Sequence, residues 1–186
     1  MDQAWVAILG TVVGGGISLG TAWWIEARKE RRIGMNVSIA AASELDAVLM
    51  ILKARDWRGN LNIAADAAKK GQVVPFFFST MRDDYLPMCR EALRHAGSID
   101  PRLAILLARA IVLADGLIAD VRSLHDRPMG TQNSLLQPSM PEMALKLFTN
   151  MVEIIDAGFS VGGQVIALVD SIYPMKREAR AASKTG

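Results

Sequence analysis

A serine flanked by glycines is the strongest catalytic candidate in this sequence. Residues 158–162 read Gly-Phe-Ser-Val-Gly, which matches the G-x-S-x-G pattern that holds a hydrolase nucleophile on a turn between a strand and a helix. In that arrangement the triad acid and histidine follow the serine, but no histidine follows Ser160. An apolar repeat with helical spacing also runs through the motif. These features disfavour a hydrolase. Gly162 and Gly163 instead indicate a close helix approach or a kink.

The other residues with metal-ligating or acid–base side chains are sparse. The chain has two histidines, His95 and His125, and one cysteine, Cys89. Zinc needs three or four ligands in one place, and this spacing does not indicate such a cluster. Asp83 and Asp84 resemble a helix cap more than a catalytic carboxylate pair. There is no P-loop, dinucleotide fingerprint or EF-hand. We therefore expect no catalytic residue, no metal site and no cofactor, and the chain is not expected to be an enzyme.

Composition separates an apolar start from a near-neutral body. The chain has 186 residues, of which 51% are hydrophobic, and its formal net charge is +2. Its mean hydropathy of +0.23 is high for a soluble protein, and the excess lies mainly in the first 25 residues. The small net charge gives no reason to expect nucleic acid as a partner. A single cysteine excludes an intrachain disulfide, which fits a reducing compartment.

An uncharged segment near the N-terminus is long enough to cross a bilayer. As a helix, Ala4 to Ile25 spans roughly 32 Å, which matches a hydrocarbon core of about 30 Å. Trp5 lies at one end of the segment and Trp23 and Trp24 at the other, where indole rings favour the headgroup region. We predict a transmembrane anchor within residues 1–32. A cleaved signal peptide is the alternative, but it would begin with basic residues, and this chain begins Met-Asp-Gln.

Four basic residues follow the apolar segment: Arg28, Lys29, Arg31 and Arg32. Because basic flanks stay in the cytoplasm, we predict that the N-terminus lies outside and the remainder of the chain inside. The same side chains can also contact anionic lipid, which adds roughly 1 kcal/mol for each basic residue near the surface. The first predicted partner is therefore the lipid bilayer.

Glycines in the apolar segment are spaced for helix association. They form two pairs separated by four residues, Gly10 with Gly14 and Gly16 with Gly20. Small residues at this spacing form a shallow groove in which a second helix backbone packs closely. Glycine is also common in membrane helices without any such role. The spacing predicts association with a second copy of the chain or with another membrane protein.

The rest of the chain has the pattern of helices joined by loops. We predict an all-α protein in which the transmembrane helix is followed by an antiparallel bundle of about four to five helices over residues 33–173, and then by a basic disordered tail over residues 174–186. Charged residues interrupt the last two helices, so neither is expected to cross the membrane. The first predicted helix runs from Val37 to about Gly59 and is either separate from the anchor or continuous with it through the weak point at Gly34. The second runs from Leu61 to Lys70 and is ended by Gly71, and the third runs from a capping box at Thr80 and Asp83 to about Ala96. The last two run from Pro101 to before Pro128 and from Pro141 to Pro174.

Three consecutive aromatic residues, Phe76, Phe77 and Phe78, lie in an apolar loop between the predicted helices. One interpretation places this loop on the core of the bundle. The other makes it a candidate contact patch for a partner or for the nearby membrane surface.

The layout resembles a loose group of uncharacterised bacterial single-pass inner-membrane proteins. The shared features are a glycine-rich anchor, the basic flank Glu26–Arg32 and a helix of the type A-A-x-E-L-x-A-x-L, here Ala41–Leu49. The resemblance implies a bacterial inner-membrane protein with a helical cytoplasmic domain, and it implies no activity.

The sequence leaves two functions open. The first is a membrane-anchored helical interaction module that self-associates or serves as an accessory subunit of a membrane assembly. The alternative is a membrane-associated sensor or defence-type effector whose helical domain rearranges on a signal. No small-molecule substrate is indicated by any motif.

Overall fold

The computed structural model describes residues 2–72, 85–125 and 141–174, and it describes side-chain surroundings for residues 21–72, 85–123 and 142–174. All regular elements within these ranges are helical, which confirms the predicted all-α class. Their order is α1 Asp2–Ala54, α2 Trp57–Lys69, α3 Pro87–Arg94, the short 3-10 helix η1 Ala96–Ser98, α4 Pro101–His125 and α5 Pro141–Ile172.

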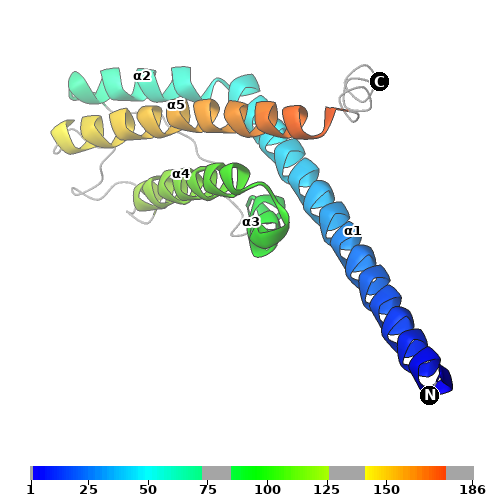
Figure 1. Ribbon diagram of the computed structural model, residues 1–186. Coiled ribbons are helices and arrows are strands. Elements are labelled where there is room, and N and C mark those ends of the chain that lie inside the picture. The colour runs from blue at the N-terminus through cyan, green and yellow to red at the C-terminus, as the bar shows by residue number, and fades with distance from the viewer. Residues whose placement is uncertain (1, 73–84, 126–140, 175–186) are drawn as a thin grey trace.

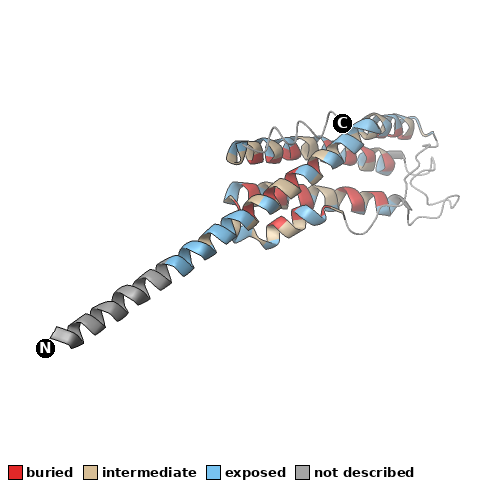
Figure 2. Cartoon of the chain, turned by 90° about the vertical axis from the view of Figure 1, so that its right-hand side faces the viewer, coloured by how far each residue is buried: buried red, intermediate tan, exposed pale blue. Residues whose placement is uncertain are grey.

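Helix α5 is the central element of the fold. It packs against α1, α2 and α4, while α3 packs between α1 and α4. Figure 1 shows α2 running beside α5 and the long helix α1 leaving the other helices toward the N-terminus. Within the stretch of α1 whose burial is described, Figure 2 shows exposed residues first and buried residues only where the helix crosses the others. The N-terminal half of α1 therefore projects from a helical body.

Helix α1 is one continuous helix of 53 residues, about 80 Å long. The predicted weak point at Gly34 does not interrupt it. Gly34 is buried, and a Cβ added there would lie 1.8 Å from the Ser98 carbonyl oxygen of η1. One turn later, the buried Ser38 hydroxyl donates a hydrogen bond to the Gly34 carbonyl oxygen over 2.6 Å. Glycine is present here because the backbone of η1 occupies the space of a side chain.

The corner between α1 and α2 lies earlier than predicted. Helix α1 ends at Ala54, and α2 begins at Trp57, four residues before the expected start at Leu61. Asp56 adopts a left-handed conformation with φ of 46°, and its carboxylate accepts a hydrogen bond from the Gly59 amide over 3.2 Å. The prediction that the first helix ends near Trp57–Gly59 is therefore wrong, because an aspartate supplies both the turn and the N-cap.

The predicted end of α2 is confirmed. Gly71 has φ of 66°, the left-handed conformation that glycine adopts without steric cost. Its amide bonds to the Ala68 carbonyl over 3.0 Å, and the Gln72 amide bonds to the Ala67 carbonyl over 2.9 Å. This pair of hydrogen bonds is a Schellman motif, which satisfies the last carbonyls of the helix.

Helix α3 begins later than predicted. The capping box at Thr80 and Asp83 lies outside the described residues, but Tyr85 and Leu86 are not helical and α3 starts at Pro87. A helix running unbroken from the capping box to Ala96 is therefore wrong. Pro87 has no amide hydrogen and disfavours the α conformation of the residue before it, and Leu86 has φ of 54°.

The start of α4 follows the prediction. Asp100 accepts a hydrogen bond from the Arg102 amide over 2.8 Å and also pairs with the Arg102 guanidinium, an interaction that lowers the pKa of the Asp100 carboxyl below its usual value. Proline follows the cap at the first helical position. The helix ends at His125, before Pro128 as expected.

The buried stripe of α5 differs from the predicted one. The sequence repeat places Val152, Phe159 and Ile166 on the core face together with Phe148 and Ile155, but those three are only partly buried. Met151 and Val165 are fully buried instead. The reason is that α5 packs against different neighbours on different sides, so its contact face is wider than one heptad seam. The buried residues of α5 are Ala144, Phe148, Met151, Ile155, Val161, Gly162, Val165 and Val169.

Two apolar clusters form the core. One lies where α1, α3, α4 and the end of α5 meet, and it contains Ala41, Leu45, Cys89, Leu103 and Leu107 among its buried residues. The other lies between α2, α4 and the start of α5 and is centred on Phe148 and Met151.

Among the residues whose side chains are described, two helices are long and apolar enough to span a membrane: the part of α1 from Thr21 to Ala54, and α5 from Glu142 to Ile172. This finding rests on length and composition alone, and core helices of soluble proteins meet the same criterion. It differs from the expectation that the last helix is too interrupted by charge to qualify. In α5, however, Glu153, Asp156 and Ser160 are exposed while the apolar stripe is buried, a pattern typical of an amphipathic core helix.

The Gly34 contact can be tested by alanine substitution. Gly34→Ala is expected to destabilise the fold by about 1–3 kcal/mol or more, because the added methyl group overlaps the Ser98 carbonyl oxygen. Gly163→Ala is the matched control in a second helix, where an added Cβ meets no atom within 4 Å. It is expected to stabilise by up to about 1 kcal/mol through helix propensity. Thermal unfolding of the full-length chain measures both, and equal effects would contradict the close approach.

Candidate functional site

The predicted membrane-interface residues that the structure describes lie on the exposed part of α1. Trp23 and Trp24 are 74% and 56% exposed, and Ile25 is also exposed. The Arg28 guanidinium carbon lies 5.1 Å from the Trp24 ring centroid, a cation–π geometry. Aromatic and basic side chains therefore adjoin on one stretch of helix.

The remaining basic residues of this flank, Lys29, Arg31 and Arg32, are also exposed. Lys29 pairs with Glu26 at 3.7 Å, a surface pair that contributes little to stability. Side-chain surroundings of Trp5 and of the glycines Gly10, Gly14, Gly16 and Gly20 lie outside the described residues, as do Phe76, Phe77 and Phe78 entirely.

The G-x-S-x-G residues belong to an unbroken part of α5. Ser160 is exposed, and its hydroxyl accepts a hydrogen bond from the Gln164 side-chain amide over 3.3 Å. The strand-to-helix turn that activates a hydrolase serine is not formed there. Gly162 is buried, and a Cβ at this position would lie 2.7 Å from the Leu49 side chain of α1. Gly162 thus serves a close crossing of α5 with α1, whereas an added Cβ at Gly163 would meet no atom within 4 Å.

The residues considered as metal ligands do not converge. His95 ends α3 and lies 3.3 Å from Glu91, and the side chain of His125 lies outside the described residues. Within the part of the chain described here, no group of three or more histidine, cysteine, aspartate or glutamate side chains could hold a metal ion.

The buried Cys89 of α3 and the partly buried Glu44 of α1 form a junction between the two helices. The Cys89 amide donates a hydrogen bond to the Glu44 carboxylate over 2.9 Å, and the Cys89 thiol donates to the Ala41 carbonyl over 3.7 Å. Burial, together with the Glu44 charge, raises the pKa of the Cys89 thiol far above its usual value. Glu44 therefore caps the first turn of α3 from another helix, and the thiol is held unreactive.

A polar cluster joins the start of α3 to α4. The Tyr85 hydroxyl donates a hydrogen bond to the Asp115 carboxylate, and Arg90 donates to the same carboxylate over 2.7 Å. The Arg90 guanidinium also lies over the Tyr85 ring, 5.4 Å from its centroid. Partial burial, followed by the hydrogen bond to Asp115, raises the pKa of Tyr85, so the hydroxyl remains a donor at neutral pH.

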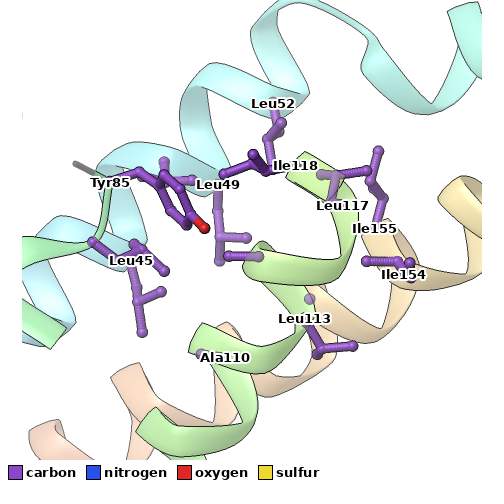
Figure 3. A pocket seen from close by; sticks show the side chains of 14 residues that line it. Leu45, Leu49, Leu52, Tyr85, Ala110, Leu113, Leu117, Ile118, Ile154 and Ile155 are labelled. Carbon is purple, nitrogen blue, oxygen red and sulfur yellow. The ribbon is translucent and has the colours of Figure 1, made fainter. Parts of the chain in front are cut away.

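An apolar pocket of about 230 Å³ lies beside this cluster, between α1, α4 and α5. Figure 3 shows aliphatic side chains from the three helices converging on it, with Tyr85 at its edge. The Tyr85 hydroxyl is the only polar side-chain atom of the lining. The fourteen lining residues are Leu45, Val48, Leu49 and Leu52 of α1; Tyr85 and Leu86; Ala110, Leu113, Ala114, Leu117 and Ile118 of α4; and Ile154, Ile155 and Gly158 of α5.

The pocket exists because small residues meet where the helices diverge. Helix α1 packs mainly against α3 and α5 rather than α4. Leu49 closes one contact at Gly162, whereas Ala110, Ala114 and Gly158 carry too little side chain to fill the space facing α1. A Cβ built at Gly158 would meet no atom within 4 Å. Packed interiors rarely leave this much volume, so the pocket is the main candidate site within the described residues.

The sequence patterns do not reveal this pocket. The apolar repeats place Leu45, Val48 and Leu52 on one face of α1 and Ala110 and Ala114 on one face of α4, but a repeat indicates burial without showing whether the facing helix fills the space. The one signal in the sequence is the pair of alanines at a four-residue spacing in α4. No sequence pattern marks Tyr85 as a pocket residue, because its position depends on where α3 begins.

Comparison with protein families, with curated proteins and with solved structures gives no match to this chain. The functional interpretation therefore depends on its own residues.

The Cys89 junction predicts strong protection of the thiol. At pH 8 the folded full-length chain is expected to react with a maleimide at least about a hundredfold more slowly than the urea-unfolded chain, because the raised pKa keeps the buried thiol protonated. Glu44→Gln removes the negative charge that raises this pKa but keeps an oxygen acceptor, so labelling should accelerate several-fold. Equal rates in the folded and unfolded chain would contradict the described junction.

Proposed function

We propose that this chain is a membrane-anchored helical interaction module of a bacterial inner membrane. Residues 1–32 form the anchor with the N-terminus outside, residues 33–173 form an antiparallel bundle in the cytoplasm, and residues 174–186 form a basic tail. The observation that carries the proposal is the continuity of α1 from Asp2 to Ala54, because it joins the apolar segment Ala4–Ile25 directly to the helices that bury Ala41 and Leu45.

The exposed indoles support the proposed membrane register. Trp23 and Trp24 present large aromatic surfaces with no core to cover them, and such rings are stable at the headgroup level. Arg28 lies one turn further on, beside Trp24, where a guanidinium can reach the anionic headgroups. In this register the bilayer ends near Ile25, and the first buried residue of the body, Gly34, follows within three turns.

Contacts between the helices support the antiparallel order. Asp120 of α4 accepts a hydrogen bond from Asn150 of α5 over 2.8 Å, and Gly116 of α4 faces Ile154 of α5. Residue numbers fall along α4 as they rise along α5, which is the pattern of antiparallel neighbours.

The proposed partner engages the anchor. The pairs Gly10/Gly14 and Gly16/Gly20 offer a groove for a second helix, either from another copy or from a membrane protein of which this chain is an accessory subunit. The Phe76–Phe78 segment remains a candidate second contact.

A sensor or effector is the second candidate function. The observation in its favour is the pocket between α1 and α4, because an occupant there would alter how the helix that carries the anchor packs on the body.

Self-association can be tested by cysteine-independent crosslinking of the full-length chain in native membranes. Gly14→Ile and Gly16→Ile are each expected to weaken association at least about tenfold, since branched side chains keep the helix backbones apart. Val12→Ile, which leaves every glycine in place, is the matched control and should crosslink like the unmodified chain. The proposal would be contradicted if the chain extracted in mild detergent were monomeric and no other membrane protein purified with it.

Orientation can be tested with a reporter fused to the C-terminus. The unmodified chain should remain with membranes after alkaline carbonate washing and place the reporter in the cytoplasm. Replacing Arg28, Lys29, Arg31 and Arg32 with glutamine should yield a mixture of orientations, because the basic flank sets the topology. Recovery of the full-length chain as a soluble monomer without detergent would refute the anchor.

A further inference from the structure

The pocket beside Tyr85 has the chemistry of a site for an alkyl chain. Water inside it would find hydrogen-bonding partners only at its edge, since aliphatic groups and backbone line the remainder. Enclosed apolar cavities of about 150 Å³ bind small apolar molecules, and this partly open apolar pocket has a volume of about 230 Å³. An apolar occupant is therefore favoured over water.

The arrangement of the lining favours a chain over a compact ring. The lining follows α1 from Leu45 to Leu52 and α4 from Ala110 to Ile118, which corresponds to roughly 10–12 Å along each helix. Each carbon of an extended alkyl chain advances by roughly 1.3 Å, given single bonds of about 1.5 Å. Eight to ten carbons, roughly, would occupy the groove between the two helices.

The edge of the pocket favours a small uncharged head. Tyr85 lines the pocket there, and Asp115 and Arg90 contact its side chain. The opposite charges of Arg90 and Asp115 leave this cluster without net charge. A carboxylate head would be attracted by Arg90 but repelled by Asp115. A hydroxyl can accept from Arg90 and donate to Asp115 in addition to the hydrogen bonds that these two side chains already make, so it is compatible with both charges.

We propose that the pocket between α1, α4 and α5 binds one unbranched alkyl chain of roughly eight to ten carbons, with a hydroxyl-type head at Tyr85, Arg90 and Asp115. The ligand is a free single-chain molecule rather than a phospholipid of the bilayer.

This choice of source rests on the proposed membrane register. Leu45, the first pocket residue of α1, lies twenty residues after Ile25, or about 30 Å along the helix. Even with α1 tilted by about 40°, the separation from the bilayer surface is roughly 23 Å. A phospholipid chain that remains in the membrane cannot reach the pocket. The pocket itself is built by the helical body and does not depend on the anchor.

The test uses the full-length chain in lipid nanodiscs with a decanol that carries a diazirine on its chain. After illumination, labelled peptides are mapped by mass spectrometry. We expect labelling of Leu45–Leu52 and Ala110–Ile118, with unlabelled decanol as a better competitor than decanoate. Labelling confined to Ala4–Ile25 would overturn the pocket while supporting the anchor, and stronger competition by decanoate would overturn the uncharged head. Pocket labelling of a chain that stays soluble would support the ligand while refuting the anchor.

Variants separate the pocket from nonspecific labelling. Ala114→Phe and Gly158→Leu extend side chains into the cavity, and each should reduce pocket labelling at least about tenfold by displacing two or more methylene groups of the ligand. Ala119→Phe on the exposed side of α4 is the matched control and should label normally. Protection of Cys89 from maleimide reports that each variant is folded. Unchanged pocket labelling in either folded variant would overturn the proposal.

Discussion

A row of small residues on one face of α1 allows the long helix to lie directly against its neighbours. Gly34 touches the Ser98 backbone, Ser38 is buried and bonded to its own helix, and Ala41 and Ala42 are fully covered. On the same helix, Glu44 accepts a hydrogen bond from the Cys89 amide of α3. The place of α1 in the fold depends on this close packing, because it holds the helix from Gly34 onward against its neighbours while the preceding residues project from the body.

The same packing explains where space remains. Helix α1 is drawn toward α3 and η1 by its small residues and meets α5 at Leu49 and Gly162, so it diverges from the stretch of α4 that carries Ala110 and Ala114. Tyr85 lines the opening that results, and its partners Arg90 and Asp115 lie next to it. A tight contact on one side of the helix and a pocket on the other are thus two results of one crossing geometry.

The sequence correctly predicts those helix ends that neighbouring residues determine. Asp100 with Pro101 marked the start of α4, and Gly71 marked the end of α2, since capping and left-handed conformations are properties of neighbouring residues. The start of α3 was missed because Pro87 and the left-handed Leu86 outweigh an upstream capping motif. The buried side of α5 was displaced from the predicted repeat because three helices share its surface. The pocket could not be predicted from the sequence, since it depends on the angle between helices far apart in the chain.

The unbroken hydrogen bonding of α1 has a mechanical consequence. No proline, bulge or irregular turn separates Asp2 from Ala54, so torque applied near the first turns cannot be absorbed along the way. Any neighbour that rotates the outer end of this helix also rotates the face bearing Gly34 and Ser38. Elements η1 and α3 then either move with α1 or lose their contacts with it.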